Sequence, residues 1–590
     1  MRMPRTTGQE SGAGEVVPAG AANGPAATEG NGAGPDHAGP EPAGPQPTAA
    51  EADSGGSGDS AGSADSAAPA DSGGQVSAPA AGRPWLSRPL GLMRRNWLAT
   101  ALLTLGLALR VLTQVSFSPV LLYIDSVKYL YGAWPYADPL GYDLPLKLIL
   151  AVGNLSAVEA VQHLLGLGMA VTIYVVLLRR GVPRWLAALA MGPVLLDAYQ
   201  LQMEATIMPD VWFEAAILAG LAVLLWVPRA TVRICLLAGF ILGLSATIRQ
   251  VGEILIIPLV IIVIAMGGGW RQVLGKTLVT ALAFIMPIFL YMSASLYING
   301  HFWLSRNGQE SAYGRLAGLV NCSTLKIPSY EQSLCPTTGE QSFGADWLDH
   351  AATSPLRNYV LKGADVPPGL TRGQAIKHFE ESIIRQQPVR VFNRIATDSF
   401  KLFSVTRNTD SGDTPISRWQ FHTAYPNFLP TIAVDKSGTI VFGLKLAAGG
   451  GALVYHQLDT AYGGNAHVWQ PGAAFLRRYQ VYGGYTPGPL LLLCVLAGLA
   501  GMLTIFRRRA SPAQRQLALG ALAFILTGTI VLVLSNLFEF SWRYQLPALV
   551  TLPPAGAFGI AAMLRFARRR KIIPIRAPAG QAERVTAKAG

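Results

Sequence analysis

Long apolar runs dominate the chain from residue 97 onward and are separated by polar connections. Most runs hold roughly 18 to 22 residues, the length of a helix that crosses a 30 Å hydrocarbon core. This pattern predicts an all-α polytopic membrane protein with about 10 (9–12) transmembrane helices. The runs lie at 97–117, 155–178, 185–203, 211–227, 232–248, 252–267, 278–298, 487–506, 516–535 and 545–563.

Two long segments lack this pattern. Residues 1–82 are rich in Gly, Ala, Pro, Ser and acids, so we expect 1–90 to be a disordered cytoplasmic tail. The tail has no short apolar core of a cleavable signal, and the first run is expected to act as an uncleaved anchor. The connection 299–486 is too long for a bare loop and predicts a mixed extracytoplasmic domain inserted late in the chain.

The remaining segments complete the predicted organisation. Residues 91–298 form an N-terminal transmembrane module whose first external loop is 118–154. Residues 487–565 are the C-terminal transmembrane helices, and 566–590 are a basic cytoplasmic tail. Within the external domain, apolar positions at helical spacing predict a helix near 371–403. The apolar segment 435–456 is interrupted by a lysine and three glycines and is interpreted as an interfacial or re-entrant helix rather than an eleventh span.

Composition and charge agree with a membrane protein. Apolar residues make up 51% of the chain and charged residues only 14%, well below the quarter that is typical of soluble domains. The net charge of +13 is uneven, because residues 1–82 carry −8 and the rest carries +21. The excess basic residues lie in every second short connection, which places those connections and both termini in the cytoplasm. Nucleic acid is therefore not an expected partner.

The four cysteines divide into two pairs by position. Cys235 and Cys494 lie inside apolar runs and are expected to pack as small residues. Cys322 and Cys335 lie in the external region, where an oxidising compartment favours a disulfide between them. No Cys/His set has zinc-finger spacing, so no metal site is expected.

Four predicted external turns carry ionisable residues at the mouths of spans. Such groups are costly near membrane depth and usually face a cavity or pair with one another. Lys128, Arg249 and Arg543 suit an anionic phosphate, and a carboxylate such as Asp125 suits a base that accepts a proton from a hydroxyl. The other candidate substrate-binding residues at these turns are Tyr142, Glu204, Asp210 and Tyr544.

Each candidate also has an ordinary structural interpretation. Arg543 and Tyr544 suit an interfacial anchor pair, and Arg249 has the spacing to pair with Glu253 along one helix face. Glu204 and Asp210 suit helix caps. Asp125, or Ser126 beside it, suits the N-cap of a helix.

The sequence also resembles a known superfamily. The motifs YIDSVKYL (123–130) and DPLGYDLPLKLIL (138–150) are similar to the first external loop of membrane-embedded C-type glycosyltransferases, which include protein O-mannosyltransferases and lipid-A aminoarabinose transferases. The resemblance continues through 161–191, 204–226 and 238–260 and ends at WRYQLPALVTLPP (542–554). It covers 97–300 and 487–565, about half of the chain.

This resemblance implies a C-type glycosyltransferase fold and a sugar donor linked to polyprenyl phosphate, which is reached from the outer leaflet of the plasma membrane. It implies that Asp125 is the catalytic base, that Lys128 contacts the donor phosphate, and that Arg249 and Arg543 contact phosphate or lipid. Ser126 stands where many members have a second acid, and GYDLP stands where GYP is usual. No cofactor is expected on this basis, although a divalent cation stays open.

The expected function is therefore transfer of a sugar to a hydroxyl of an envelope polysaccharide, lipid or protein on the extracytoplasmic side. Two other classes remain as alternatives: a polytopic transporter and a noncatalytic envelope assembly protein. Transporters often show internal repeats and charges near the midplane, whereas the charges here lie at span mouths.

Overall fold

The computed structural model describes most of the chain after residue 90, and the predicted tail 1–90 lies outside the described residues. All of the described residues belong to one unit of the chain, 83–590. They are 91, 93–131, 139–305, 308–426, 428, 432–434, 437–445, 453–458, 462–506 and 510–572.

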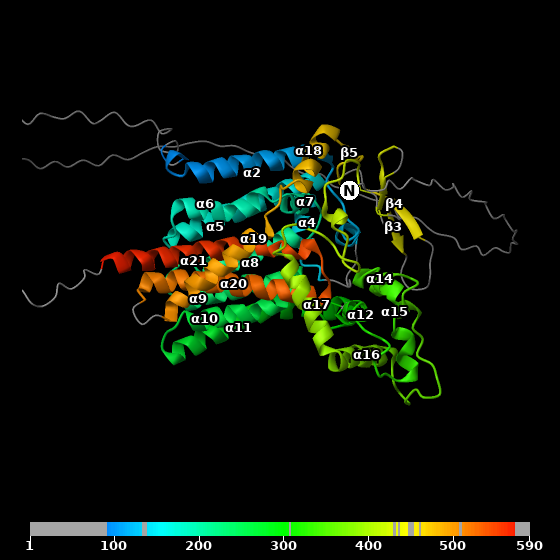
Figure 1. Ribbon diagram of the computed structural model, residues 1–590. Coiled ribbons are helices and arrows are strands. Elements are labelled where there is room, and N and C mark those ends of the chain that lie inside the picture. The colour runs from blue at the N-terminus through cyan, green and yellow to red at the C-terminus, as the bar shows by residue number, and fades with distance from the viewer. Residues whose placement is uncertain are drawn as a thin grey trace, which may run out of the picture. The chain divides into compact units, whose positions relative to one another are not determined.

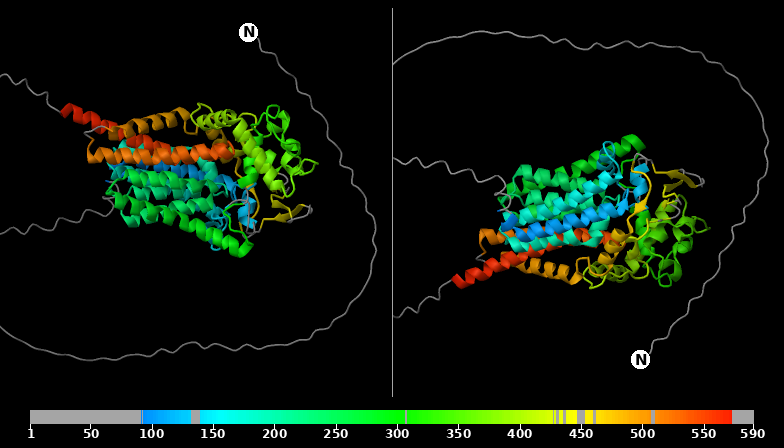
Figure 2. Two further views of the ribbon diagram at one scale, coloured as in Figure 1. Left: turned by 90° about the horizontal axis from the view of Figure 1, so that it is seen from below. Right: turned by 90° about the horizontal axis from the view of Figure 1, so that it is seen from above.

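Among the described residues, five helices are long and apolar enough to cross a membrane. They are α2 (Trp97–Ser116), α5 (Leu155–Arg179), α11 (Trp270–Asn299), α20 (Pro512–Phe538) and α21 (Pro547–Ile572). Five shorter apolar helices lie beside them: α6 (Arg184–Leu196), α8 (Asp210–Leu224), α9 (Val232–Ile248), α10 (Ile256–Ala265) and α19 (Gly488–Met502) (Figures 1 and 2). The chain is thus a mostly helical, multi-pass membrane protein, and the count of ten spans stays a prediction.

Several predicted boundaries were wrong. The predicted run 185–203 is two helices, α6 and α7 (Ala198–Glu204), because Asp197 breaks the helix: its side chain accepts a hydrogen bond from the Tyr199 amide and caps α7. The run 252–267 begins as the 3-10 helix η1 (Gln250–Leu255) before α10. At the C-terminus, α21 continues to Ile572, and the basic cytoplasmic tail at 566–590 stays a prediction.

Small residues allow the helices to approach closely, as is common in membranes. A Cβ at Gly243 on α9 would lie 2.1 Å from the Phe284 carbonyl oxygen on α11, and one at Gly501 on α19 would lie 2.3 Å from the Gly559 Cα on α21. A larger residue at either position would separate the paired helices. The long α20 starts with a capping box, in which Ser511 and Gln514 satisfy each other's amides.

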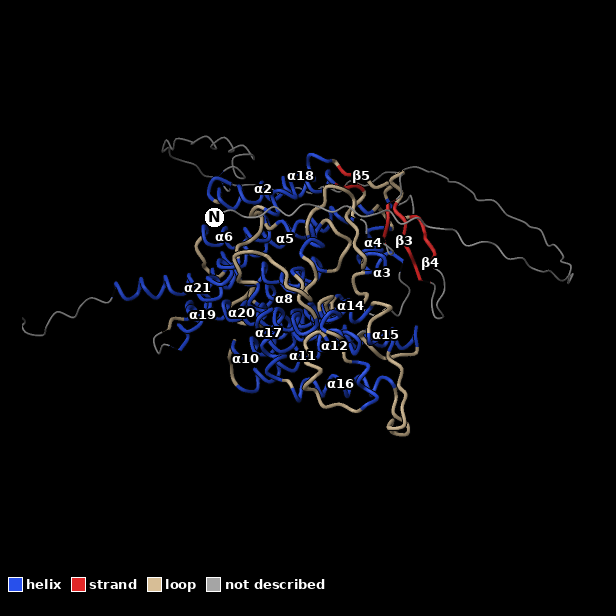
Figure 3. Tube along the Cα trace, turned by 45° about the vertical axis from the view of Figure 1, so that its right-hand side comes forward, coloured by secondary structure: helices blue, strands red, loops and turns tan. Residues whose placement is uncertain are grey.

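The region between α11 and α19 forms a separate set of small elements at one end of the helices (Figures 1 and 3), and we call it the external region after its predicted side of the membrane. It has its own apolar core, built around Tyr313, Phe379 and Ile383, and Cys322 and Cys335 form a disulfide with a Cα–Cα distance of 6.0 Å beside that core. Its helices are α12 (Gly308–Ala317), η2 (Ser329–Leu334), α13 (Thr338–Gln341), α14 (Ala345–His350), α15 (Pro355–Asn358), α16 (Arg372–Gln386), α17 (Pro388–Lys401), η3 (Ile416–Trp419) and α18 (Gln470–Val481).

The helix expected near 371–403 is present as α16 and α17, but the helix interpretation of 435–456 was wrong. The described part of that segment forms the antiparallel strands β3 (Ile440–Lys445) and β4 (Leu453–Gln457), and β2 (Ile432–Val434) pairs with β3. Buried Ile440 and Phe442 alternate with less buried neighbours, the two-residue period of a strand with one covered face. A second ribbon pairs β1 (Phe117–Ser118) with β5 (His467–Val468) and ties the end of α2 to the external region.

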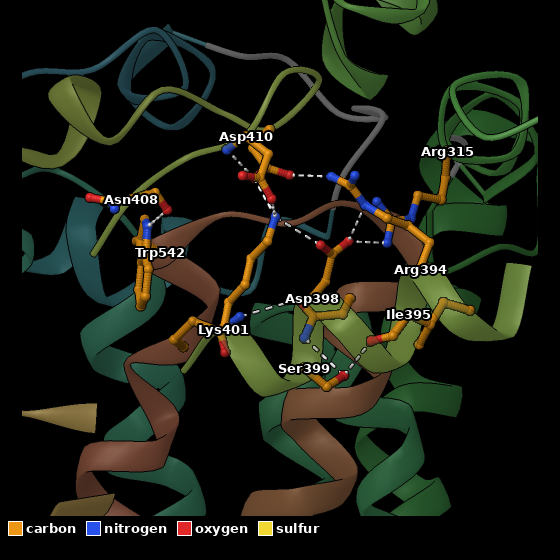
Figure 4. Close-up of polar contacts among 12 residues, drawn as sticks. Arg315, Arg394, Ile395, Asp398, Ser399, Lys401, Asn408, Asp410 and Trp542 are labelled. Atoms are coloured by element: carbon orange, nitrogen blue, oxygen red, sulfur yellow. Dashed lines mark hydrogen bonds and ion pairs between the residues drawn. The ribbon is translucent and has the colours of Figure 1, made fainter. Parts of the chain in front are cut away.

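A largely buried ion network joins α12, α17 and the segment that follows α17 within the external region (Figure 4). Asp398 on α17 lies 2.5 Å from Arg315, 3.1 Å from Arg394 and 3.0 Å from Lys401. Asp413 pairs with Arg394 at 2.7 Å and with Lys401 at 2.5 Å. Lys401 also lies 4.4 Å from the ring centroid of Phe540, just after α20. We call Arg315, Arg394, Asp398, Lys401, Asp410 and Asp413 the anchor network.

Candidate functional site

The first external loop is bonded to the turn between α7 and α8. The Leu121 amide donates to the Ala205 carbonyl, and the Ile207 amide donates to the Leu121 carbonyl. The Ser126 hydroxyl donates to the Ile207 carbonyl and accepts from the Tyr123 amide. Ser126 therefore fixes the backbone on either side of Asp125, close to the start of α8.

The same loop is also fixed to the end of α9. The Gly141 amide donates to the Thr247 carbonyl at 2.8 Å. A Cβ on Gly141 would lie only 2.5 Å from that oxygen, so only glycine fits without a shift. The loop is therefore fixed to Thr247, a residue two positions before Arg249, and Arg249 is the C-cap of α9.

The Asp125 carboxylate lies between two cations that come from opposite ends of the sequence. Oδ1 is 3.4 Å from Lys128 Nζ, and Oδ2 is 3.2 Å from Arg543 Nη1. The Asp125 side chain is 29% exposed, whereas Arg543 is only 8% exposed. Both carboxylate oxygens of Asp125 thus contact cations, whereas the side chain of a helix cap accepts a hydrogen bond from a backbone amide. Part of the carboxylate remains accessible to solvent.

A second carboxylate extends this cluster. Asp210, the first residue of α8, lies 3.7 Å from Arg543 Nε and accepts a hydrogen bond from Arg249. The three cations Lys128, Arg249 and Arg543 therefore share two carboxylates. This group, which we call the cation cluster, has a formal net charge of +1, so it is complementary to a singly charged anion.

Aromatic rings hold the two arginines in place. The Arg543 guanidinium carbon lies 4.8 Å from the ring centroids of both Trp419 and Tyr544. Tyr544 is also 4.8 Å from the Arg249 guanidinium carbon, and its hydroxyl accepts from Arg543 Nη2 at 3.0 Å. Such cation–π contacts stabilise desolvated guanidinium groups and fix the direction in which they present their N–H donors.

The external region contacts the cation cluster through η3, in which Trp419 stacks on Arg543. Arg418 donates to the Tyr123 hydroxyl at 3.3 Å and lies 3.4 Å from Asp346 on α14. Tyr123 in turn packs on Trp419, with a centroid distance of 4.7 Å. The Arg418 side chain is 34% exposed, so this part of the site is open to solvent.

One further carboxyl lies next to the cluster. Glu539 follows α20 and accepts a hydrogen bond from the Thr414 hydroxyl. Burial, followed by the charge of Asp346, raises the pKa of Glu539 from 4.5 to about 7, although Arg543 and Arg418 act in the opposite direction. Asp125 behaves in the opposite way: burial raises its pKa, but Lys128 and Arg543 outweigh burial and hold the pKa well below its ordinary value.

Two predicted site residues lie elsewhere. Glu204 is fully buried between Arg110, at 2.7 Å, and His163, at 3.0 Å. Tyr142 is also buried, and its hydroxyl donates to Gln162. Gln162 donates to the Glu204 and Thr206 carbonyls, so these residues support the loop that carries Asp125 rather than join the cation cluster.

The structure also decides between the ordinary interpretations of the arginines. Arg249 pairs with Asp210 instead of Glu253, and Arg543 is too buried for an interfacial anchor. Among the described residues there is no group of three or more His, Cys, Asp or Glu side chains arranged to hold a metal ion.

Arg418, Tyr123 and Asp346 were not among the predicted site residues. Arg418 and Asp346 belong to an external region with many other polar residues, and the sequence has no local signal that selects them. Tyr123 lies two residues before Asp125, and this proximity was the available signal.

Comparisons with known proteins add little to this geometry. No family model and no curated protein matches the chain. One similar solved structure is the S. cerevisiae protein O-mannosyltransferase Pmt1-Pmt2 complex bound to the sugar donor, with 16% identity over 39% of this chain and 37% of that chain, and a TM-score of 0.28. Another is the Archaeoglobus fulgidus oligosaccharyltransferase tethered with an acceptor peptide, with 10% identity over 79% of this chain and 50% of that chain, and a TM-score of 0.35.

This chain therefore spans half or less of each similar structure. At these TM-scores neither likeness carries an argument about activity, so a functional assignment has to come from the site itself.

Proposed function

We propose that the chain is an integral membrane glycosyltransferase of the plasma membrane. It moves a sugar from a polyprenyl-phosphate-linked donor to a hydroxyl acceptor on the extracytoplasmic side, in glycosylation of an envelope glycan, lipid or protein. The observation that carries the proposal is the cation cluster, in which the partly exposed Asp125 carboxylate lies against two cations and the cluster as a whole has a formal net charge of +1. A sugar linked to polyprenyl phosphate is a phosphodiester with a single negative charge, which this cluster would neutralise.

The proposed reaction is one displacement at the anomeric carbon. The acceptor oxygen forms a bond to that carbon while the bond from the carbon to the phosphate oxygen breaks. The acceptor proton moves to the Asp125 carboxylate, and the electron pair of the broken bond stays on the phosphate. The leaving phosphate gains a second negative charge, and fixed cations such as Arg543 stabilise charge that develops in this way.

The low pKa of Asp125 fits a base that is activated by its substrate. Without a ligand, Lys128 and Arg543 keep the carboxylate ionised and weakly basic. A donor phosphate that takes over hydrogen bonds from these two cations would let the Asp125 pKa rise towards its ordinary value. Proton transfer is most efficient when the base pKa lies nearer the working pH.

The decisive experiment compares the wild-type protein with Asp125→Asn in detergent, using a synthetic polyprenyl-phosphate sugar and acceptor material from the envelope. We expect transfer to fall by about 10²–10⁴-fold, the usual contribution of a general base, while the donor still binds. Unchanged transfer by Asp125→Asn would refute the assignment. Solute uptake into proteoliposomes without donor consumption would favour a transporter, and the absence of both activities would favour an assembly protein.

A further inference from the structure

An open cavity lies along α5, α8 and α9 and extends away from the cation cluster, and its lining residues Leu164 and Leu237 are exposed. It has a volume of about 770 Å³, within the roughly 300–1,000 Å³ of ligand cavities. Its walls are almost entirely apolar and come from α5, α8 and α9, with Leu164, Gly168, Leu218, Ala222, Trp226 and Ile234 among the lining residues.

The helix α8, which begins at Asp210, also lines the cavity, so distances along it show where the cavity lies relative to the cation cluster. Ala215 and Val223 both line the cavity, and at 1.5 Å per residue they lie about 8 Å and about 20 Å along the axis of α8 from Asp210. On α9 the lining residue Ile234 is likewise about 22 Å from Arg249. The cavity therefore extends to the end of the bundle that is opposite to the proposed active site.

Exposed arginines surround that end of the cavity. Arg179 donates from Nε to the Trp226 carbonyl at 2.9 Å, and its guanidinium carbon lies 4.6 Å from the Trp226 ring centroid. Arg229 follows Trp226 by three residues, and Arg233 directly precedes Ile234; both are exposed. Neither makes a hydrogen bond or ion pair with another described residue that would neutralise it.

No acid of the flanking segments balances these charges, because 164–196 and 215–252 contain neither Asp nor Glu. An apolar cavity that ends at unneutralised arginines is complementary to a molecule with a hydrocarbon chain and an anionic headgroup. We propose that this cavity binds an anionic phospholipid of the leaflet opposite to the active site, with an acyl chain along α5, α8 and α9 and its phosphate at Arg179 and Arg233. The polyprenyl chain of the donor is the competing occupant, but its phosphate is expected at the other end of the bundle.

Glycine positions provide a steric test with a matched control. A Cβ at Gly168, which lines the cavity, would meet no atom within 4 Å, and the same holds for Gly275 on the exposed surface of α11. Gly168→Leu should therefore fill the cavity without a clash, whereas Gly275→Leu places the same side chain in the bilayer. A charge test has a similar control, because Arg271 stacks on exposed Trp270 as Arg179 stacks on Trp226.

The full chain would be purified in mild detergent and titrated with phosphatidylglycerol or phosphatidylcholine. Retained lipid would be measured by mass spectrometry, and stabilisation by the thermal unfolding midpoint. We expect only phosphatidylglycerol to raise the midpoint of the wild-type protein. Its apparent affinity should fall about fivefold for each of Arg179→Gln and Arg233→Gln, and Gly168→Leu should abolish its retention, with no change for Arg271→Gln or Gly275→Leu.

Equal stabilisation by both lipids, or equal behaviour of each variant and its control, would overturn the proposal. It would also be overturned if Gly168→Leu weakened binding of a polyprenyl phosphate and left phosphatidylglycerol binding intact, because the cavity would then hold the donor chain. None of these measurements depends on sugar transfer, so a failure of the proposed function would leave their outcome unaffected.

Discussion

The anchor network and the cation cluster are both made of carboxylates, arginines and a lysine, but they differ in charge balance and in burial. In the anchor network three carboxylates face three cations, Asp398 and Asp413 are fully buried, and the ion-pair distances are 2.5 to 3.1 Å. In the cation cluster two carboxylates face three cations, and the contacts of Asp125 are longer, at 3.2 and 3.4 Å. Charge balance and burial are what separate the two groups.

This difference separates a structural role from a binding role. A balanced, buried network leaves no charge for a ligand, and removing one partner leaves an uncompensated charge in a dry environment. The cation cluster, in contrast, has three cations for two carboxylates, so one positive charge is left for a ligand. One of its two carboxylates, Asp125, is also accessible.

The largest effect on folding is expected for Asp398→Ala, which removes the buried counter-ion of Arg315, whereas Arg394 and Lys401 keep Asp413. We expect the free energy of unfolding to fall by about 3–5 kcal/mol, measured by denaturant or thermal unfolding in detergent. Asp410→Ala is the control, because Asp410 also pairs with Lys401 at 2.8 Å but is 61% exposed. That variant should lose less than about 1 kcal/mol, and similar losses in both variants would remove the distinction between the two groups.

The next prediction concerns Arg543, the residue shared by Asp125 and Asp210. Arg543→Gln should lower kcat by about 10²–10³-fold, as removal of a preorganised donor to a developing charge does. Arg418→Gln, at the exposed edge of the site, should mainly change KM. If Arg543→Gln lowered only the unfolding midpoint and left kcat unchanged, then Arg543 would belong with the anchor residues.

The smallest effect should be the pH dependence caused by Glu539. Its pKa is about 7 in the folded protein, against an ordinary value of 4.5, so the folded state holds a proton that the unfolded state has lost between these values. Stability should therefore fall as the pH rises from 4.5 to 7 and should be independent of this group outside that window. Thermal unfolding over pH 4 to 8 measures the slope.

Glu539→Gln should reduce that slope, because the amide does not titrate, whereas Asp143 and Glu380, whose pKa values burial raises to about 6 and about 8, keep the rest of it. Glu381→Gln, which removes a surface carboxylate that pairs with Arg385 on α16, should leave it unchanged. A wild-type slope that survives unreduced in Glu539→Gln would assign the titration to another group.

Much of the membrane part was predictable because each apolar run has to become a helix in hydrocarbon. The break at Asp197 was not, because it depends on capping and on an ion pair with Arg407, 210 residues away. The same limit applies to the site. Their positions at the mouths of spans made Asp125, Lys128, Arg249 and Arg543 site candidates from the sequence. The partner of Arg249 is Asp210 and not Glu253 because of tertiary packing, which a local sequence pattern does not show.

One available signal was not used. Arg110 lies in the middle of the first apolar run, where a charge is costly and requires a partner. The structure provides Glu204 as that partner, at 2.7 Å, and thereby gives Glu204 a role in supporting the loop. Treating Arg110 as a residue in need of a counter-ion would have moved Glu204 out of the substrate-binding set.

The contact between Asp125 and Arg543 joins residues 418 positions apart. During synthesis on the ribosome, Asp125 is made early, and its arginine partner arrives only when the last apolar helix is being made. A prematurely terminated product would consequently lack the completed charge arrangement, even if its earlier helices had inserted correctly. Activity would thus begin only with a fully translated and inserted chain.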